Sequence, residues 1–187
     1  MRRPLAAVLL GALLAVAGCT GQPAPTAATR PGPAVETATS GIDALFLAMM
    51  VAHTGQTLEL VQVGLDRGTD PELRTLIAAV RATETDELAT MRGWLREAGP
   101  SAVAAAERHD HSGHSDATAG LARLRAAPAG QVDRVLIDVL TAHQRTAADL
   151  ARAQVQAGTS ARVRDLAGRI ERSRTAEVAL LVKLRAR

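Results

Sequence analysis

The chain has 187 residues, with 22 Lys and Arg against 19 Asp and Glu, one Cys, one Phe, one Trp and no Tyr. This length fits one domain or at most two small ones. Two aromatic rings exclude a base-stacking surface for nucleic acid, and a single Cys excludes a disulfide framework or a zinc ribbon. Because the formal charge is only +3, we expect no nucleic-acid partner.

The first residues predict a lipoprotein signal peptide, residues 1–18. Arg2 and Arg3 are followed by an apolar run, residues 5–17, that is too short to span a bilayer in the mature protein. Val16-Ala17-Gly18-Cys19 resembles a bacterial lipobox, so we expect cleavage before Cys19 and lipidation of that residue. Acyl chains would anchor the protein in the membrane, on the outer face of the cytoplasmic membrane or in the periplasm. The alternative is an ordinary secretion signal with a chance cysteine.

Residues 19–40 are rich in Pro, Ala, Thr and Gly, a composition that cannot build a packed core. We expect a lipidated Cys19 followed by a disordered linker. The folded part should then be residues 41–187, which is long enough for a sizeable core.

An internal repeat organises the folded part. Segments 46–95 and 136–185 align without a gap when the sequence is shifted by 90 residues, and His53 then falls on His143. Apolar residues recur in each segment in steps of four and three, which predicts amphipathic helices.

The repeat predicts two helical hairpins, in 41–99 and 128–187, joined by a His-containing loop, 100–127. We expect an all-α protein, a ferritin-like antiparallel four-helix bundle.

Turn and cap residues support these boundaries. Gly68 and Gly158 are expected to end the first helix of each hairpin as glycines in the position after the C-cap. Asp70 and Ser160 are expected to cap the second helices. Residues 40–43, Ser-Gly-Ile-Asp, resemble a capping box at the start of the first helix.

The four helical stripes are apolar at both ends and polar in the middle. Counting outward from the two glycine turns places His53 level with Glu84, and His143 level with Arg174. Buried polar groups must pair with each other or bind a ligand. The bundle centre should therefore hold His53, Gln56, Glu84, Glu87, His143, Thr146, Arg174 and Glu177.

Two interpretations of this centre compete. In the first it is a metal site with Met50, His53, Glu87 and Met91 as ligands, since thioethers suit Cu(I). In the second it is a structural polar centre formed by Glu84, His143, Arg174 and Glu177. Arg174 would then pair with Glu84, Glu87 or Glu177, and each His would donate to a carboxylate. A di-iron oxidase is a third and weaker interpretation, because the Glu-x-x-His pairs of such sites are missing.

The first hairpin carries a resemblance to a known family. Phe46, the Met49-Met50 and Ala52-His53 pairs, the run 67–74, Glu84-x-x-Glu87-Leu88 and Met91-Arg92-x-Trp94-Leu95 resemble the family known as domain of unknown function 305. The resemblance covers about residues 42–187 and is weaker in the second hairpin. It implies a ferritin-like, two-hairpin bacterial protein that is often secreted or lipidated, and some relatives bind copper in the periplasm.

The resemblance transfers only part of a ligand set. The family's Met-Met…His-His motif keeps Met49, Met50 and His53, but Thr54 stands where the second His is expected. Glu84 replaces the Gln that usually opens the family's Gln-x-x-Glu motif. In the second hairpin only His143 and Glu177 correspond, so this member could keep the fold without the site.

A second candidate metal site lies between the hairpins, where His109, His111 and His114 fall within six residues. Closely spaced neutral imidazoles beside carboxylates can chelate Cu(II) or Zn(II). The alternative is a solvated polar loop.

These observations lead to one leading hypothesis and one from a different class. We expect a non-enzymatic, membrane-anchored envelope lipoprotein that binds transition metal, copper before zinc, in metal homeostasis. The alternative is a structural or interaction module with an ion-paired centre, which docks an unidentified protein of the envelope. No nucleophile elbow, phosphate-binding Gly loop or HExxH motif is present.

Overall fold

The computed structural model describes residues 41–107 and 117–187. The described residues form six α-helices and no strand: α1 (Gly41–Arg67), α2 (Pro71–Glu97), α3 (Pro100–Glu107), α4 (Ala117–Ala126), α5 (Val132–Ala157) and α6 (Ala161–Arg185), with a short 3-10 turn at Ala129–Gln131. The all-α prediction is confirmed. The predictions for the signal peptide, Cys19, the linker, His109, His111 and His114 concern residues outside the described ranges.

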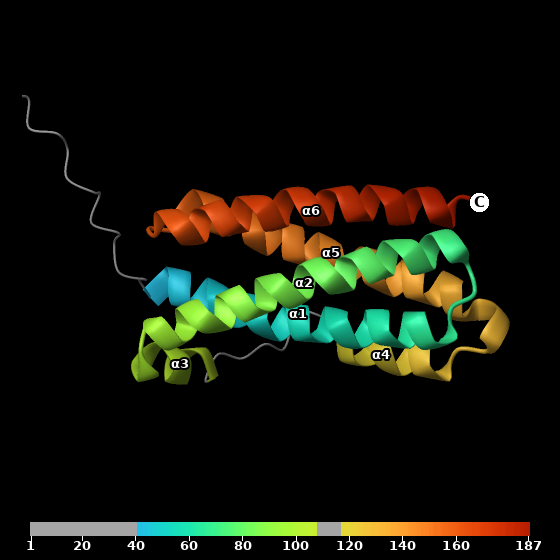
Figure 1. Ribbon diagram of the computed structural model, residues 1–187, viewed down its shortest axis with the longest axis horizontal. Helices are drawn as coiled ribbons and strands as arrows, with labels where there is room; N and C mark the ends of the chain where they lie inside the picture. Colours follow the sequence, from blue (N-terminus) through green and yellow to red (C-terminus); the bar gives the residue numbers. More distant parts are fainter. Residues whose placement is uncertain (1–40, 108–116) are drawn as a thin grey trace, which may run out of the picture. The chain divides into compact units, whose positions relative to one another are not determined.

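The four long helices pack as two hairpins. Helices α1 and α2 pack against each other across a turn at residues 68–70, and α5 and α6 do so across a turn at 158–160. The hairpins meet chiefly through α1 and α5, which lie side by side along the molecule (Figure 1). This pairing brings the polar stretches of both hairpins to one level.

The segment that connects the hairpins differs from the expected loop. Residues 100–127 include α3 and α4, because the alanine-rich stretches in this segment favour helix. Leu124 of α4 is fully buried, and α4 packs on α1 and α5. Arg67, at the end of α1, donates to the carbonyls of Leu124, Arg125 and Ala127 at 2.5 to 3.0 Å, and so satisfies the C-terminal carbonyls of α4.

Two apolar clusters flank the polar centre. One contains Phe46, Leu47, Met50, Met91, Leu95, Ala147, Val163, Leu166 and Ile170, and the other contains Leu60, Leu73, Ile77, Val80, Leu124, Leu136, Leu140 and Leu181. Ile42 is 43% exposed, whereas its neighbour Asp43 is fully buried. Helix α1 is long and apolar enough to cross a membrane by length and composition, but just over half of its most apolar window is buried inside the bundle.

Asp43 and Asp133 each bind the turn of the opposite hairpin. Asp43 accepts hydrogen bonds from Gln154 Nε2, from the backbone and hydroxyl of Thr159 and from the backbone of Ser160, at 2.6 to 3.1 Å. The carboxylate of Asp43 thus serves the α5–α6 turn, while the capping box expected at residues 40–43 includes Ser40, which lies outside the described residues. Asp133, 90 residues later, accepts from Thr69 and Asp70 in the same way.

The turn glycines are needed for space and not for a left-handed backbone. Helix α5 ends before Gly158, whose φ is −65°, and Gly99 is the one glycine in the described residues with positive φ. A Cβ on Gly68 would lie 2.6 Å from Gly64 O and 2.7 Å from Asp133 Oδ1. The predicted position after the C-cap is wrong for Gly158, which is itself the C-cap of α5, and a Cβ there would lie 2.7 Å from Gln154 O of the preceding helical turn.

The N-caps of the second helices follow the prediction in position. Asp70 caps α2 and its carboxylate accepts from the backbone of Leu73 at 2.8 Å. Ser160 occupies the same place before α6, but its side chain makes no capping hydrogen bond. Asp43 instead holds its backbone N–H.

Candidate functional site: the polar centre of the bundle

Arg174 lies at the middle of the bundle and faces three carboxylates. Its side chain is 1% exposed, with Nε 3.3 Å from Glu84 Oε1 and Nη1 3.3 Å from Glu177 Oε1. Its Nη2 pairs with Glu87 Oε2. Glu84 and Glu87 come from α2, whereas Arg174 and Glu177 come from α6. The guanidinium therefore holds together the second helices of the two hairpins.

Gln144 of α5 completes this network, a role that the sequence analysis missed. Its amide nitrogen donates to Glu84 Oε1 at 2.7 Å and to Glu177 Oε2 at 2.6 Å, and the residue is fully buried. The resemblance had singled out this position only as one that lacks a histidine. Its place directly after His143, on the inner face of α5, was the available signal.

Among the described residues, the two buried histidines contact each other. Each Nε2 lies 3.1 to 3.2 Å from the backbone carbonyl of the other residue, and the rings stack with centroids 3.6 Å apart and planes within 4°. Because a carbonyl only accepts, both Nε2 atoms carry the proton. The expectation that His53 donates to a carboxylate is wrong, because its Nε2 donates to the backbone carbonyl of His143. Helices α1 and α5 approach closely enough at this level for ring-to-backbone bonds.

Burial sets the protonation of these rings. The pKa of His53 is lowered to about 3. Desolvation is the largest cause, the neighbouring His143 and Arg174 act in the same direction, and the hydrogen bond to the backbone opposes them. Desolvation likewise lowers the pKa of His143 to about 4, with Arg174 acting in the same direction. Both rings are therefore neutral at physiological pH, a state in which Nε2 can still donate to the carbonyl.

Burial by itself shifts the pKa values of Glu84 and Arg174 in opposite directions, because it disfavours the charged form of each. Desolvation raises the pKa of Glu84 to about 7, although Arg174 and Gln144 oppose the shift. Its Oε2 has no hydrogen-bond partner among the described residues, which leaves desolvation dominant. Burial by itself would lower the pKa of Arg174, but Glu84, Glu177 and Glu87 raise it above its usual value. The centre thus holds one permanent cation and a carboxyl group that titrates near neutrality.

The four residues of the core metal candidate are in different surroundings. Met50 and Met91 are fully buried in the apolar cluster around Phe46. Glu87 is paired with Arg174, and His53 bonds to the backbone of α5. In the ranges 41–107 and 117–187 no three His, Cys, Asp or Glu side chains form a group that could hold a metal ion. Metal binding by this set would require breaking both polar contacts.

The remaining predicted members of the centre lie at its edge. Thr146 is half-buried and its hydroxyl donates to Ala142 O at 3.4 Å within α5. Gln56 is also half-buried. Thr57, which was not predicted, is fully buried, and its hydroxyl donates to His53 O at 3.3 Å.

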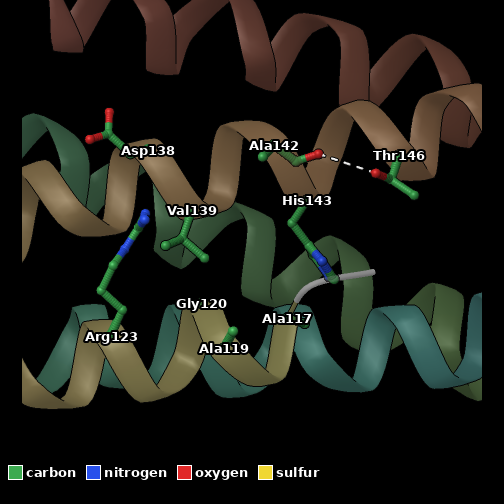
Figure 2. A pocket seen from close by; sticks show the side chains of 9 residues that line it. All are labelled: Ala117, Ala119, Gly120, Arg123, Asp138, Val139, Ala142, His143 and Thr146. Carbon is green, nitrogen blue, oxygen red and sulfur yellow. Dashed lines mark hydrogen bonds between the residues drawn. The ribbon is translucent and has the colours of Figure 1, made fainter. Parts of the chain in front are cut away.

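A hollow of about 340 Å³ lies between α4 and α5 next to His143. Figure 2 shows the His143 ring extending from α5 toward Ala117, where α4 begins, and Arg123 and Asp138 at the other end of the hollow. Asp138 also pairs with Arg185 at 2.7 Å. Ala117, the first described residue after the segment that contains His109, His111 and His114, lines this hollow.

The aspartate contacts between the hairpins were also missed by the sequence analysis. A shift of 90 residues places Asp43 on Asp133, and each of these residues binds the Thr that follows the turn glycine of the other hairpin. Extending the repeat by one helical turn beyond residue 46 would have revealed this pair.

Comparison with known proteins places the chain in a family. The family described as "Domain of unknown function (DUF305)" matches residues 43–185. A search of curated proteins gives no match.

Solved structures of similar fold agree with that match. A DUF305 fragment from Deinococcus radiodurans is 18% identical with a TM-score of 0.69, covering 79% of this chain and 97% of that one. A Streptomyces coelicolor DUF305 protein whose description proposes secretion is 25% identical with a TM-score of 0.67, covering 76% and 89%. CopM in the Cu(II)-bound form is 22% identical with a TM-score of 0.64, covering 77% and 95%. CopM in the Cu(I)-bound form is 21% identical with a TM-score of 0.62, covering 76% of this chain and 94% of that one.

Proposed function

The chain belongs to the DUF305 family, and on this premise we propose that it is a lipoprotein of the cell envelope, anchored through Cys19, that binds transition metal and copper first. Its proposed role is non-catalytic and belongs to metal homeostasis outside the cytoplasm. The lipobox-like residues before Cys19 support the anchor. The copper-bound forms of CopM support the choice of metal by their shared fold.

The observation that carries the metal proposal is the spacing of His109, His111 and His114. Three imidazoles within six residues supply the ligands that Cu(II) and Zn(II) take in proteins. The methionine ligands that would favour Cu(I) are absent from this segment, so Cu(II) is the first candidate and Zn(II) the second.

We place the proposed metal in this segment and not in the bundle centre. His53 Nε2 and Glu87 Oε2 are engaged, and Arg174 puts a fixed positive charge beside them. A second cation there would meet electrostatic repulsion in a medium of low dielectric constant. Met50 and Met91 remain as thioethers in an apolar cluster.

A metal titration of the acylated full chain, extracted in detergent, tests the proposal. Cu(II), Cu(I) and Zn(II) are titrated against a competing chelator, with bound stoichiometry and Tm as readouts. A ligand that binds only the folded state raises stability by RT ln(1 + [L]/Kd). We expect binding to be lost in the combined His109→Ala, His111→Ala, His114→Ala variant.

The matched control removes the candidate thioethers of the core at nearly constant volume, as Met50→Leu with Met91→Leu. Loss of binding in this control alone would move the site into the bundle. Dissociation constants weaker than about 100 μM for all three ions, or about 5.5 kcal/mol of binding free energy, would contradict a metal role.

The second candidate function is a structural module that docks another envelope protein. The observation in its favour is the paired centre, in which Arg174 and Gln144 together engage all three carboxylates. Each carboxylate of this core thus has a partner inside the bundle. This function predicts an unchanged Tm on metal addition and a partner that is recovered by crosslinking in intact cells.

A further inference from the structure

A groove on the outer side of α6 carries three arginines. It has a volume of about 570 Å³ and is lined by Val155 of α5 and by Arg164, Asp165, Gly168, Arg169 and Arg172 of α6. Three guanidinium groups against one carboxylate give this groove an excess of positive charge. The formal charge of the whole chain, +3, does not indicate this local excess.

The groove has room because residue 168 is a glycine. A Cβ at Gly168 would lie 3.4 Å from Arg172 Nη1 and 3.8 Å from Val155 Cγ2. The Arg172 guanidinium therefore folds back along α6 over the glycine. A larger residue at 168 would displace it from the groove.

The guanidinium groups of Arg169 and Arg172 have no hydrogen bond or ion pair to another described residue, whereas nearby arginines do. Arg162 pairs with Glu97 at 2.8 Å, and Arg152 pairs with both Asp149 and Glu171. Arg164 makes one long bond, 3.4 Å, to Gly158 O. The donors in the groove are thus available to an anion, and paired guanidinium forks match phosphate oxygens well.

The groove lies toward the end of the bundle where the chain enters it. Asp43, in the first turn of α1, binds Thr159 and Ser160 directly before α6. Figure 1 shows the start of α1, the end of α2 and the α5–α6 turn together at this end. The arginines follow within the first three turns of α6.

We propose that this arginine groove binds the phosphate of anionic phospholipid headgroups and docks the bundle on the membrane. The inference rests on the proposed anchor at Cys19 for the proximity of the membrane. Residues 20–40 are the only connection between that cysteine and α1. The disordered linker that their composition predicts would span about 25 Å on average, and the anchor would then keep the groove close to the headgroups.

Charge and geometry favour a lipid over a soluble phosphate compound. The groove is shallow and shared between two helices, it has one apolar wall at Val155, and it retains the carboxylate of Asp165. An isolated anion would bind weakly there. Each basic residue near an anionic membrane surface contributes about 1 kcal/mol, which is about fivefold in the docking equilibrium.

The fluorescence of Trp94 provides the test, because it is the only Trp and lies at this end of the bundle. Its ring is 5.0 Å from the guanidinium carbon of Arg162. The acylated full chain is reconstituted in phosphatidylcholine vesicles with or without phosphatidylglycerol, and with nitroxide-headgroup lipid as quencher. We expect quenching to rise with the anionic lipid and to fall at high salt.

Arg169→Gln with Arg172→Gln should reduce the ratio of docked to undocked protein by at least about tenfold. The matched control is Arg134→Gln with Arg145→Gln, which removes the same charge from exposed positions of α5 and should leave quenching unchanged. Equal quenching with and without anionic lipid, or equal loss in both variants, would overturn the proposal.

Two further arms separate the alternatives. Inorganic phosphate is added to the chain in neutral vesicles; a rise in Tm that disappears in the groove variant would identify a free-oxyanion site and overturn docking on lipid. Cosedimentation with neutral vesicles measures membrane association through the Cys19 anchor alone. If the anchor fails, docking is still measured as cosedimentation that requires phosphatidylglycerol and the two arginines.

Discussion

His53 and His143 occupy equivalent places in the two repeats, and each donates its Nε2 proton to the backbone carbonyl of the other. The stacked rings therefore join α1 to α5 at the level where the two hairpins are related by the 90-residue shift. A protonated imidazole would still donate from Nε2. Two adjacent buried cations beside Arg174 would nevertheless be strongly unfavourable.

Acid should destabilise the bundle through this histidine pair. The folded-state pKa values of about 3 and about 4 lie below the ordinary value of 6.5. The unfolded chain therefore binds more protons, so stability is fully present above pH 6.5 and is lost as pH falls toward 4 and 3. Each pKa unit corresponds to about 1.4 kcal/mol, so the loss should reach several kcal/mol.

Urea unfolding at pH values from 3 to 8 measures this effect. Replacement of both rings, as His53→Gln with His143→Gln, should flatten the profile between pH 6.5 and 4 whatever its effect on stability at pH 7. A wild-type profile that is flat over this interval would contradict neutral, buried imidazoles.

Glu84 should produce a pH dependence of opposite sign. Its folded-state pKa of about 7 exceeds its ordinary value of 4.5, so the folded chain binds more protons in this interval. The contribution is fully present below pH 4.5 and is lost as pH rises through 7. Glu84→Gln should therefore remove the decline in unfolding free energy that this group contributes between pH 4.5 and 7, and Glu59→Gln, an exposed position, should not.

Removing the charge of Arg174 should be among the most damaging single changes in the bundle. Arg174→Met keeps much of the side-chain volume but leaves Glu84, Glu87 and Glu177 buried without their cation. Breaking a buried ion pair from one side costs about 3–5 kcal/mol. Chemical denaturation at pH 7 measures the change in unfolding free energy.

A compensated variant distinguishes charge from shape at this position. Arg174→Met combined with Glu84→Gln, Glu87→Gln and Glu177→Gln should recover a substantial part of the loss, because no carboxylate then lacks its partner. Stability as low as that of Arg174→Met alone would show that guanidinium packing matters more than its charge.

Asp43 and Asp133 should contribute unequally despite their equivalent positions. Asp43 is fully buried, while Asp133 is half-buried and three of its contacts are at exposed positions. We expect Asp43→Ala to cost about 2–3 kcal/mol and Asp133→Ala about 1–2 kcal/mol, the range for hydrogen bonds to charged groups and caps.

Amide hydrogen exchange gives the local readout for these aspartates. The Thr159 and Ser160 amides should lose protection in Asp43→Ala, and those of Thr69 and Asp70 in Asp133→Ala. Asp66→Ala, which removes one exposed bond to Gln62, serves as the control and should change neither pair.

Glycine-to-alanine changes should have opposite signs at two positions. Gly93 lies inside α2 with nothing within 4 Å of a Cβ, so Gly93→Ala should stabilise the protein by about 0.5–1 kcal/mol. Gly68→Ala should destabilise it, because the new methyl group would overlap Gly64 O and Asp133 Oδ1. A shift in Tm of the same sign for both variants would argue against this account of the turn.

The sequence by itself determined the helices and their grouping. Three signals can be recognised without knowing which helices pack together: the periodicity of apolar residues, the cap at Asp70 and the repeat with a shift of 90 residues. The same counting placed Glu84, Glu87, Arg174 and Glu177 at one level, because the rise per residue of a helix is fixed. Only the short helices α3 and α4 were overlooked, since eight to ten residues give a weak periodic signal.

The tertiary structure decided which partner each polar group has. Helix periodicity gives the height of a residue but not the distance between two helix axes. The separation of α1 and α5 directs the rings of His53 and His143 to backbone carbonyls and leaves the carboxylates to Arg174 and Gln144. Both aspartates follow the same rule, because their function arises from close approach of segments 63 to 117 residues apart.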